Sequence, residues 1–217
     1  MVTFSADGNR PLLRGYVHLA AAIVAPFALV GLLLVADSPR AYVSGAVFGT
    51  GLILLYATSA SYHVVRWRPR LHRLMRRVDQ SMIFVFIAAT YTPFCLQALS
   101  GRWGTALLLS VWLVAAAGVV QKLTWAGAPR WLDVGLYLAI GWVGVVAGGE
   151  LVQRLSIGPA LLMVLGGLLF SGGGLIYGLR RPDPLPHIFG YHEIFHVLVV
   201  AGTAVFYTLI AAVVLPS

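Results

Sequence analysis

The residues best suited to bind a metal or to take part in catalysis are histidines that lie at the ends of apolar segments. His192 and His196 stand four residues apart in the stretch His-Glu-Ile-Phe-His. On a helix this spacing places both imidazoles on one face, where two nitrogens can bind a single metal ion. His63, which ends the stretch Ser-Ala-Ser-Tyr-His, would supply a third ligand from a neighbouring segment. Three protein ligands and one open position are typical of catalytic rather than structural zinc.

Two other side chains fit the chemistry of a metal-activated water. Asp79 would hydrogen-bond the water on the metal, orient it and accept its proton during attack. Ser59 lies one helical turn before His63 and would stabilise a developing oxyanion or orient a ligand. We therefore predict Asp79 and Ser59 as catalytic groups, with Asp79 also linked to the metal through water. Imidazole binds several metals, and the preference for zinc rests on ligand geometry.

Two alternative interpretations apply to these histidines. Imidazoles at a membrane interface can simply hydrogen-bond lipid headgroups or backbone carbonyls. The stretch 192–196 also matches His-Glu-x-x-His, a zinc-protease motif in which Glu193 would be the general base. An intramembrane protease of that kind would need an acidic third ligand on a later helix, and nothing acidic follows Glu193. We therefore interpret Glu193 as an interfacial residue. His18 is expected to contact the ligands rather than to bind the metal.

The elements that must position these residues are membrane-spanning helices. Of the 217 residues, 59% are hydrophobic and 10% are charged, whereas soluble domains carry about 25% charged residues. The apolar runs are continuous rather than alternating, which indicates helices and not a barrel. A span needs about 20 apolar residues. Runs of that kind predict one domain over residues 1–217, an all-α integral membrane bundle with seven spans near 15–36, 42–65, 78–99, 103–121, 131–149, 157–179 and 193–215.

The basic residues orient this bundle. Seven spans place twelve of the fifteen lysines and arginines on one side and leave Arg40, Arg102 and Arg154 on the other. The positive-inside rule then puts the N-terminus in the cytoplasm and the C-terminus outside. His63, Asp79 and the pair His192/His196 all fall at the cytoplasmic edge. The net charge of +8 therefore reflects topology and not nucleic-acid binding, and we expect membrane lipids as partners.

Four stretches in this order carry a family resemblance: Ser59–His63 with Arg66-Trp67, Arg77–Phe84, Ala88–Phe94 and Gly190–His196. With the seven spans, the chain resembles the hemolysin III branch of the progestin and adipoQ receptor family. The resemblance implies a zinc site on the intracellular side, with ligands at His63, His192 and His196 and with Asp79 linked through water. Wider relatives resemble alkaline ceramidases, which hydrolyse a lipid amide. Many bacterial members have histidine where this chain has Gln80.

The leading hypothesis is a zinc-dependent hydrolase of a lipid amide or ester, in the bacterial plasma membrane, with the substrate's acyl chain held between the helices. A membrane receptor or sensor with structural zinc is the alternative from another class. A pore, suggested by the hemolysin name, should display polar rings along its lining, and the span centres have few such residues. The same scarcity argues against a proton pump or a transporter with a midplane carboxylate.

Overall fold

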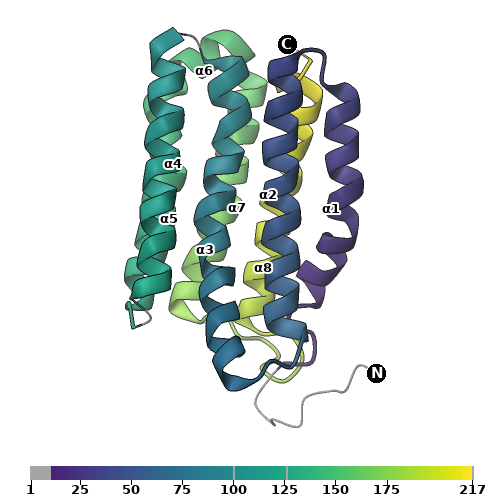
Figure 1. Cartoon of the computed structure of the whole chain (residues 1–217), viewed down its shortest axis with the longest axis vertical. Coiled ribbons are helices and arrows are strands. Elements are labelled where there is room, and N and C mark those ends of the chain that lie inside the picture. Colours follow the sequence, from purple (N-terminus) through teal and green to yellow (C-terminus); the bar gives the residue numbers. More distant parts are fainter. Residues whose placement is uncertain (1–10, 100, 126, 217) are drawn as a thin grey trace.

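The structure, a computed structural model, describes residues 11–99, 101–125 and 127–216. This part of the chain has seven helices that are long and apolar enough to cross a membrane, as predicted. They form one bundle of roughly antiparallel helices (Figure 1). The chain is therefore a multi-pass membrane protein. Arg10, counted above with the basic residues, lies outside the described residues.

Six of the spans are built on one long helix each. These are α1 (Tyr16–Val35), α2 (Pro39–Val64), α3 (Pro69–Pro93), α4 (Gly101–Thr124), α7 (Ile157–Leu179) and α8 (Tyr191–Leu209). A π-helical turn extends α3 (η1, Phe94–Ala98) and another extends α8 (η3, Ile210–Val214). The fifth span is composite, with α5 (Arg130–Trp142), the 3₁₀ turn η2 (Val143–Ala147) and α6 (Gly148–Leu155).

The start of the third span differs from the prediction. The predicted spans near 42–65 and 78–99 leave residues 66–77 as a loop between them. However, α3 already begins at Pro69, so Asp79 lies almost three turns inside the helix. Proline is favoured at the first helical position, and arginine is a good helix former. These basic turns are helical although they are too polar to be recognised as a span. The fifth span is also longer than predicted, because α6 continues to Leu155.

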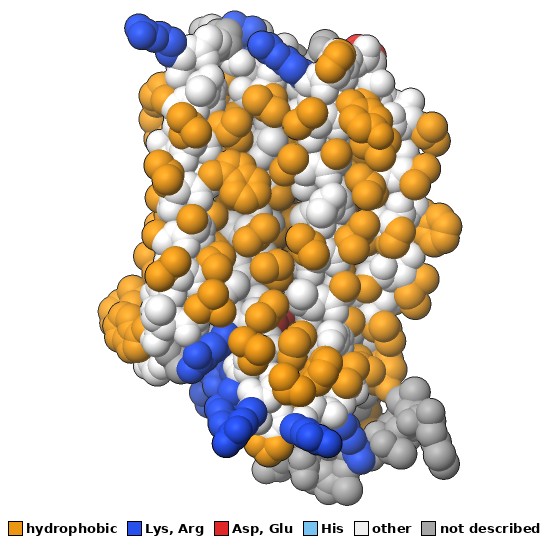
Figure 2. Space-filling model, viewed as in Figure 1, with side chains coloured by type: hydrophobic (Ala, Val, Ile, Leu, Met, Phe, Trp, Pro, Cys, Tyr) orange, Lys and Arg blue, Asp and Glu red, His pale blue; other side chains and the backbone are white. Residues whose placement is uncertain are grey.

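The last helix closes the bundle onto the first. Successive helices pack on one another from α1 to α4, and α8 contacts both α7 and α1. As a result, the end of α2 and the start of α8 meet at one end of the molecule, together with the basic first turns of α3. We call this the arginine-rich end. The larger group of lysine and arginine side chains in Figure 2 lies there, below a broad hydrophobic band. The positive-inside rule predicts that it faces the cytoplasm.

Small residues allow the first two helices to approach closely. A Cβ atom built on Gly49 would lie 2.5 Å from Leu29 Cδ1 and 3.1 Å from Leu29 Cα. Close backbone contact of this kind is how helices associate in lipid, where no hydrophobic force drives them together. In contrast, a Cβ atom at Gly148 would meet nothing within 4 Å. Glycine is therefore required by packing at position 49 and not at position 148.

Gly49→Ala is expected to destabilise the protein, because the added methyl group forces α1 and α2 apart. Overpacking of this kind costs about 1–3 kcal/mol. The measurement is the unfolding temperature of the detergent-purified variant, with Gly148→Ala as the matched control. A Gly148→Ala protein that loses as much stability as Gly49→Ala would contradict this account of the α1–α2 interface.

Candidate metal centre

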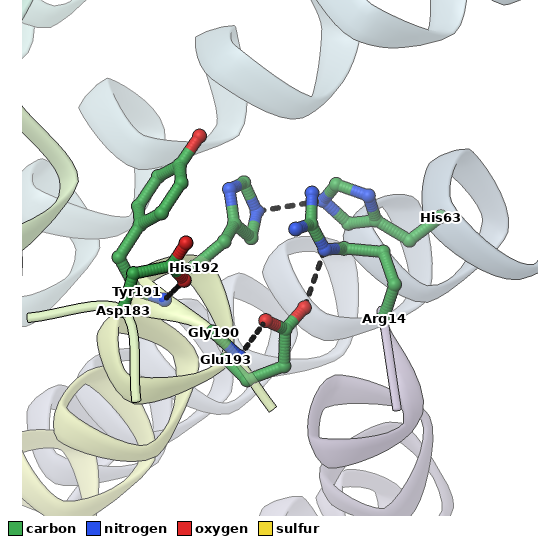
Figure 3. Close-up of polar contacts among 7 residues, drawn as sticks. All are labelled: Arg14, His63, Asp183, Gly190, Tyr191, His192 and Glu193. Carbon is green, nitrogen blue, oxygen red and sulfur yellow. Dashed lines mark hydrogen bonds and ion pairs between the residues drawn. The ribbon is translucent and has the colours of Figure 1, made fainter. Parts of the chain in front are cut away.

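Three histidines from two helices converge at the arginine-rich end. His63 lies on the last turn of α2, and His192 and His196 lie on the first two turns of α8. Each offers a ring nitrogen, and the three nitrogens lie within 4.8 Å of one another. The Nε2 atoms of His63 and His192 are 3.1 Å apart, and Figure 3 shows these two rings pointing toward each other. The cluster could therefore hold a metal ion.

The spacing of one pair of these nitrogens fits a tetrahedral ion. Zinc binds imidazole nitrogen at about 2.0–2.1 Å, so two ligands of one tetrahedral centre stand about 3.3 Å apart. The observed 3.1 Å between the Nε2 atoms of His63 and His192 is close to that value. His196 is 2% exposed, and its Nδ1 atom has no hydrogen-bond partner among the described residues. Three imidazoles, of which those of His63 and His196 are buried and that of His192 is half-buried, are a donor set suited to zinc and related transition metals.

A buried ion pair fixes the start of α8 against the N-terminal segment. Glu193 is fully buried and forms an ion pair with Arg14, which lies just before α1 (Figure 3). Its other oxygen accepts a hydrogen bond of 2.8 Å from the Gly190 backbone amide. The interpretation of Glu193 as an interfacial residue is therefore wrong. Because Glu193 lies between His192 and His196 in sequence, the pair positions the helical turn that presents both histidines.

The sequence carried one signal for this role of Glu193. Glutamate three residues after a helix-capping position is the pattern of a capping box, and Gly190 and Glu193 have that spacing. Nothing in the sequence indicated that Arg14, 179 residues away, is the ionic partner. Gly15 also matters locally: its φ is +86°, a conformation that favours glycine, and a Cβ atom there would strike His63.

His18 connects a predicted metal ligand, His196, to the predicted oxyanion group, Ser59, without joining the cluster itself. Its ring stacks on that of His196, with 3.8 Å between the ring centroids and 11° between the planes. Its Nδ1 atom hydrogen-bonds Ser59 Oγ at 2.8 Å. Both His18 and Ser59 are buried. The structure thus places Ser59 next to the histidine cluster, through a contact made by α1.

Asp79 faces the same space from α3. It is half-buried, and its carboxylate lies near the Ser59 hydroxyl. The residues predicted from the sequence as metal ligands and catalytic groups therefore all line one cavity: Ser59, His63, Asp79, His192 and His196. Gln80 lines it as well, and its backbone carbonyl accepts a hydrogen bond from the Tyr137 hydroxyl.

This cavity extends from the histidines far into the bundle. Its volume is about 880 Å³. Beyond the histidines its wall is mainly apolar. The side chains that form it come from several helices and from the turns between them; examples are Phe94, Leu99, Val152, Met163 and Phe206. The site therefore joins a compact polar end to a long apolar chamber. Such a shape suits a molecule with one reactive polar group and one hydrocarbon chain.

Comparison with known proteins agrees with these features. A family model described as "Haemolysin-III related" matches residues 7–207. The chain is 35% identical over 162 residues to the Hemolysin-3 homolog of Bacillus subtilis, covering 75% of this chain and 73% of that protein. It is 30% identical over 203 residues to Hemolysin-3 of Bacillus cereus, covering 92% and 90%. It is also 28% identical over 187 residues to the adiponectin receptor protein of Drosophila melanogaster, covering 76% of this chain and 41% of that protein.

Glu193→Gln is expected to lower both stability and metal affinity, because it leaves the Arg14 charge without its partner. Breaking a buried ion pair costs about 3–5 kcal/mol, and loss of a group that orients metal ligands costs about 10- to 100-fold in affinity. The measurements are the unfolding temperature and a zinc titration against a competing chelator.

The matched control is Glu150→Gln, whose pair with Arg154 at 3.2 Å is largely exposed. Exposed pairs contribute at most about 1 kcal/mol. If Glu193→Gln behaved like Glu150→Gln in both measurements, the positioning role of Glu193 would be excluded.

Proposed function

This chain belongs to the haemolysin III-related family of multi-pass membrane proteins, and from that premise we propose that it is a metal-dependent hydrolase of a lipid amide or ester. One observation carries the proposal: three histidines and Asp79 line the polar end of a cavity whose remaining length is apolar. A lipid whose acyl chain fills the apolar part would present its carbonyl carbon to the histidines.

The metal we propose is zinc, held by His63, His192 and His196. When bound, it supplies Lewis-acid activation of the substrate carbonyl and of water. The three imidazoles must be neutral to bind it.

Asp79 is the proposed general base. Hydrolysis requires that water lose a proton as its oxygen bonds to the carbonyl carbon, and that the leaving nitrogen or oxygen gain one. A carboxylate beside the histidine cluster can accept the first proton and return it to the leaving group. Asp79 lines the cavity at the required end, and the described acidic residues of the other helices there, Glu193 and Asp133, are both held in ion pairs.

Ser59 is proposed to stabilise the carbonyl oxygen as negative charge develops on it. A hydroxyl group has one proton to donate and two positions to accept. If His18 donates its Nδ1 proton to Ser59 Oγ, the serine proton is left for the side that faces Asp79, where a substrate oxygen beside Asp79 could accept it. His18 thus sets the direction of the Ser59 donor, and its stacking on His196 holds it at that position.

The apolar chamber contributes position rather than affinity. A lipid tail is already surrounded by hydrocarbon in the bilayer, so moving it into the cavity gains little hydrophobic energy. Fixing the tail among Phe94, Met163 and Phe206 instead places the scissile bond at one depth beside Asp79. This restriction of geometry is a source of rate enhancement in its own right.

A second function from a different class is a sensor in which the metal is structural. The observation that favours it is that the three histidines join α2 to α8, so a bound ion would fasten distant parts of the chain. In that case the metal would raise thermal stability, and Asp79 would have no part in turnover.

Asp79→Asn is expected to reduce hydrolysis by about 100-fold or more, because general bases contribute about 10²–10⁴ to rates. Bound zinc should be unchanged, since the histidines are intact. The measurement is fatty-acid release from a ceramide or an acyl ester by purified protein, alongside its metal content. Asp37→Asn, in the exposed loop after α1, is the control.

Two results would count against the proposal. Full activity in a zinc-loaded Asp79→Asn protein would exclude Asp79 as the base. A zinc-loaded wild-type protein that turned over neither amide nor ester lipids, yet lost thermal stability with chelator, would favour the sensor.

A further inference from the structure

Two arginines from different helices line the cavity at its arginine-rich end, and one of them packs on Tyr177 of α7. Arg130, the first residue of α5, places its guanidinium carbon 5.0 Å from the centroid of the Tyr177 ring, and its Nη1 atom is 3.5 Å from the Tyr177 carbonyl oxygen. Arg76 of α3 lines the same cavity, as do Arg130 and Tyr177. Contacts to Tyr177 therefore hold Arg130 against the cavity wall.

The same tyrosine connects these charges to the histidine cluster. The rings of Tyr177 and His192 are 5.5 Å apart between centroids. Arg130 therefore stands only one aromatic ring away from a predicted metal ligand. A substrate with its carbonyl at the histidines would extend its non-acyl part toward Arg130 and Arg76, within a distance that a small headgroup can cover.

Two other arginine or lysine charges around the cavity are already paired with carboxylates. Arg14 pairs with Glu193. Asp133, one turn after Arg130, pairs with Lys122 of α4, and both side chains of that pair are buried. In the part of the chain that the structure describes, neither Arg76 nor Arg130 forms an ion pair with a carboxylate. The lining thus holds two arginines that form no ion pair among the described residues, against a single carboxylate outside the ion pairs, Asp79, so positive charge remains in excess there.

Topogenic arginines would account for positive charge at this end but not for this arrangement. Arginines that serve only to orient a membrane protein extend into water or lipid headgroups. Arg73, one turn before Arg76, is exposed as Arg76 is, but only Arg76 lines the cavity. Arg77 donates to the Leu123 carbonyl at 2.9 Å and is also absent from the cavity wall. The position of Arg130 over Tyr177 is instead that of a binding group.

We propose that the substrate carries an anionic oxygen group, phosphate or carboxylate, on the side of the scissile bond away from the acyl chain, and that Arg76 and Arg130 bind this group. The inference rests on the proposed function, because it takes an acyl chain to occupy the apolar chamber. The planar guanidinium matches carboxylate and phosphate geometry through two parallel hydrogen bonds. Arg76 and Arg130 are thus the residues that select the headgroup.

The test compares two lipids that differ only in charge, ceramide and ceramide 1-phosphate with the same acyl chain. Binding to the full-length protein in non-ionic detergent is measured by thermal stabilisation across a lipid titration, and hydrolysis is measured in parallel. The wild-type protein should bind the phosphorylated lipid about 10-fold more tightly or better, the gain expected of hydrogen bonds to a charged group. Arg130→Gln and Arg76→Gln should each lose most of this preference.

Controls separate the site from general surface charge. Arg73→Gln removes an exposed arginine of the same helix and should keep the full preference. Arg130→Lys keeps the charge but not the planar fork, so a folded Arg130→Lys protein with an intermediate preference supports binding through the fork. Inorganic phosphate is titrated alone, because a free anion offers the same chemistry as a lipid headgroup.

Each result decides the inference separately from the hydrolase proposal. Equal binding of the two lipids by wild-type protein overturns it, even if both lipids are hydrolysed. A preference that survives both glutamine variants overturns it as well, and so does stabilisation by inorganic phosphate as strong as that by the phosphorylated lipid. An arginine-dependent preference without any turnover supports the headgroup site and counts against the hydrolase instead.

Discussion

Hydrocarbon offers no hydrogen-bonding partner, so polar side chains within this bundle must be satisfied by other parts of the same chain. Those at the arginine-rich end meet this constraint in pairs: Arg14 with Glu193, Lys122 with Asp133, His18 with Ser59 and His63 with His192. Each pair joins two different elements of the chain. The requirement that makes buried polar groups costly therefore also fixes the relative positions of α1, α2, α4, α5 and α8.

Concentrating these pairs at one end leaves the rest of the interior apolar. The cavity passes from the histidines into a chamber lined by residues such as Phe94 and Phe206. A molecule that fits this space must be divided in the same way, with its reactive group at one end and hydrocarbon at the other. On the proposed function, a lipid would bind in one orientation, with the bond to be broken beside His63, His192 and His196.

The sequence predicted those features that depend on local patterns. Long apolar runs gave the seven spans, and the four-residue spacing of His192 and His196 gave one shared helical face. The sequence did not reveal the role of Glu193, because an acidic residue at the start of a helix has the same pattern whether it is solvated or in an ion pair. Its partner Arg14 is also 179 residues away. The basic first turns of α3 were taken for a loop because hydropathy detects burial in lipid and not helicity. The cavity is a product of tertiary packing, which a local pattern does not specify.

Whether His63, His192 and His196 bind a metal ion is tested most directly by the metal content of the purified protein. Wild type is measured beside His196→Ala and His187→Ala. His187 lies exposed in the loop before α8 and serves as the control. We expect about one zinc per chain in the wild type and in His187→Ala, and we expect His196→Ala to have lost this zinc. A well-folded wild-type protein without metal, even after incubation with zinc, would contradict this expectation, because the three imidazoles would then be partners of one another and not ligands of an ion.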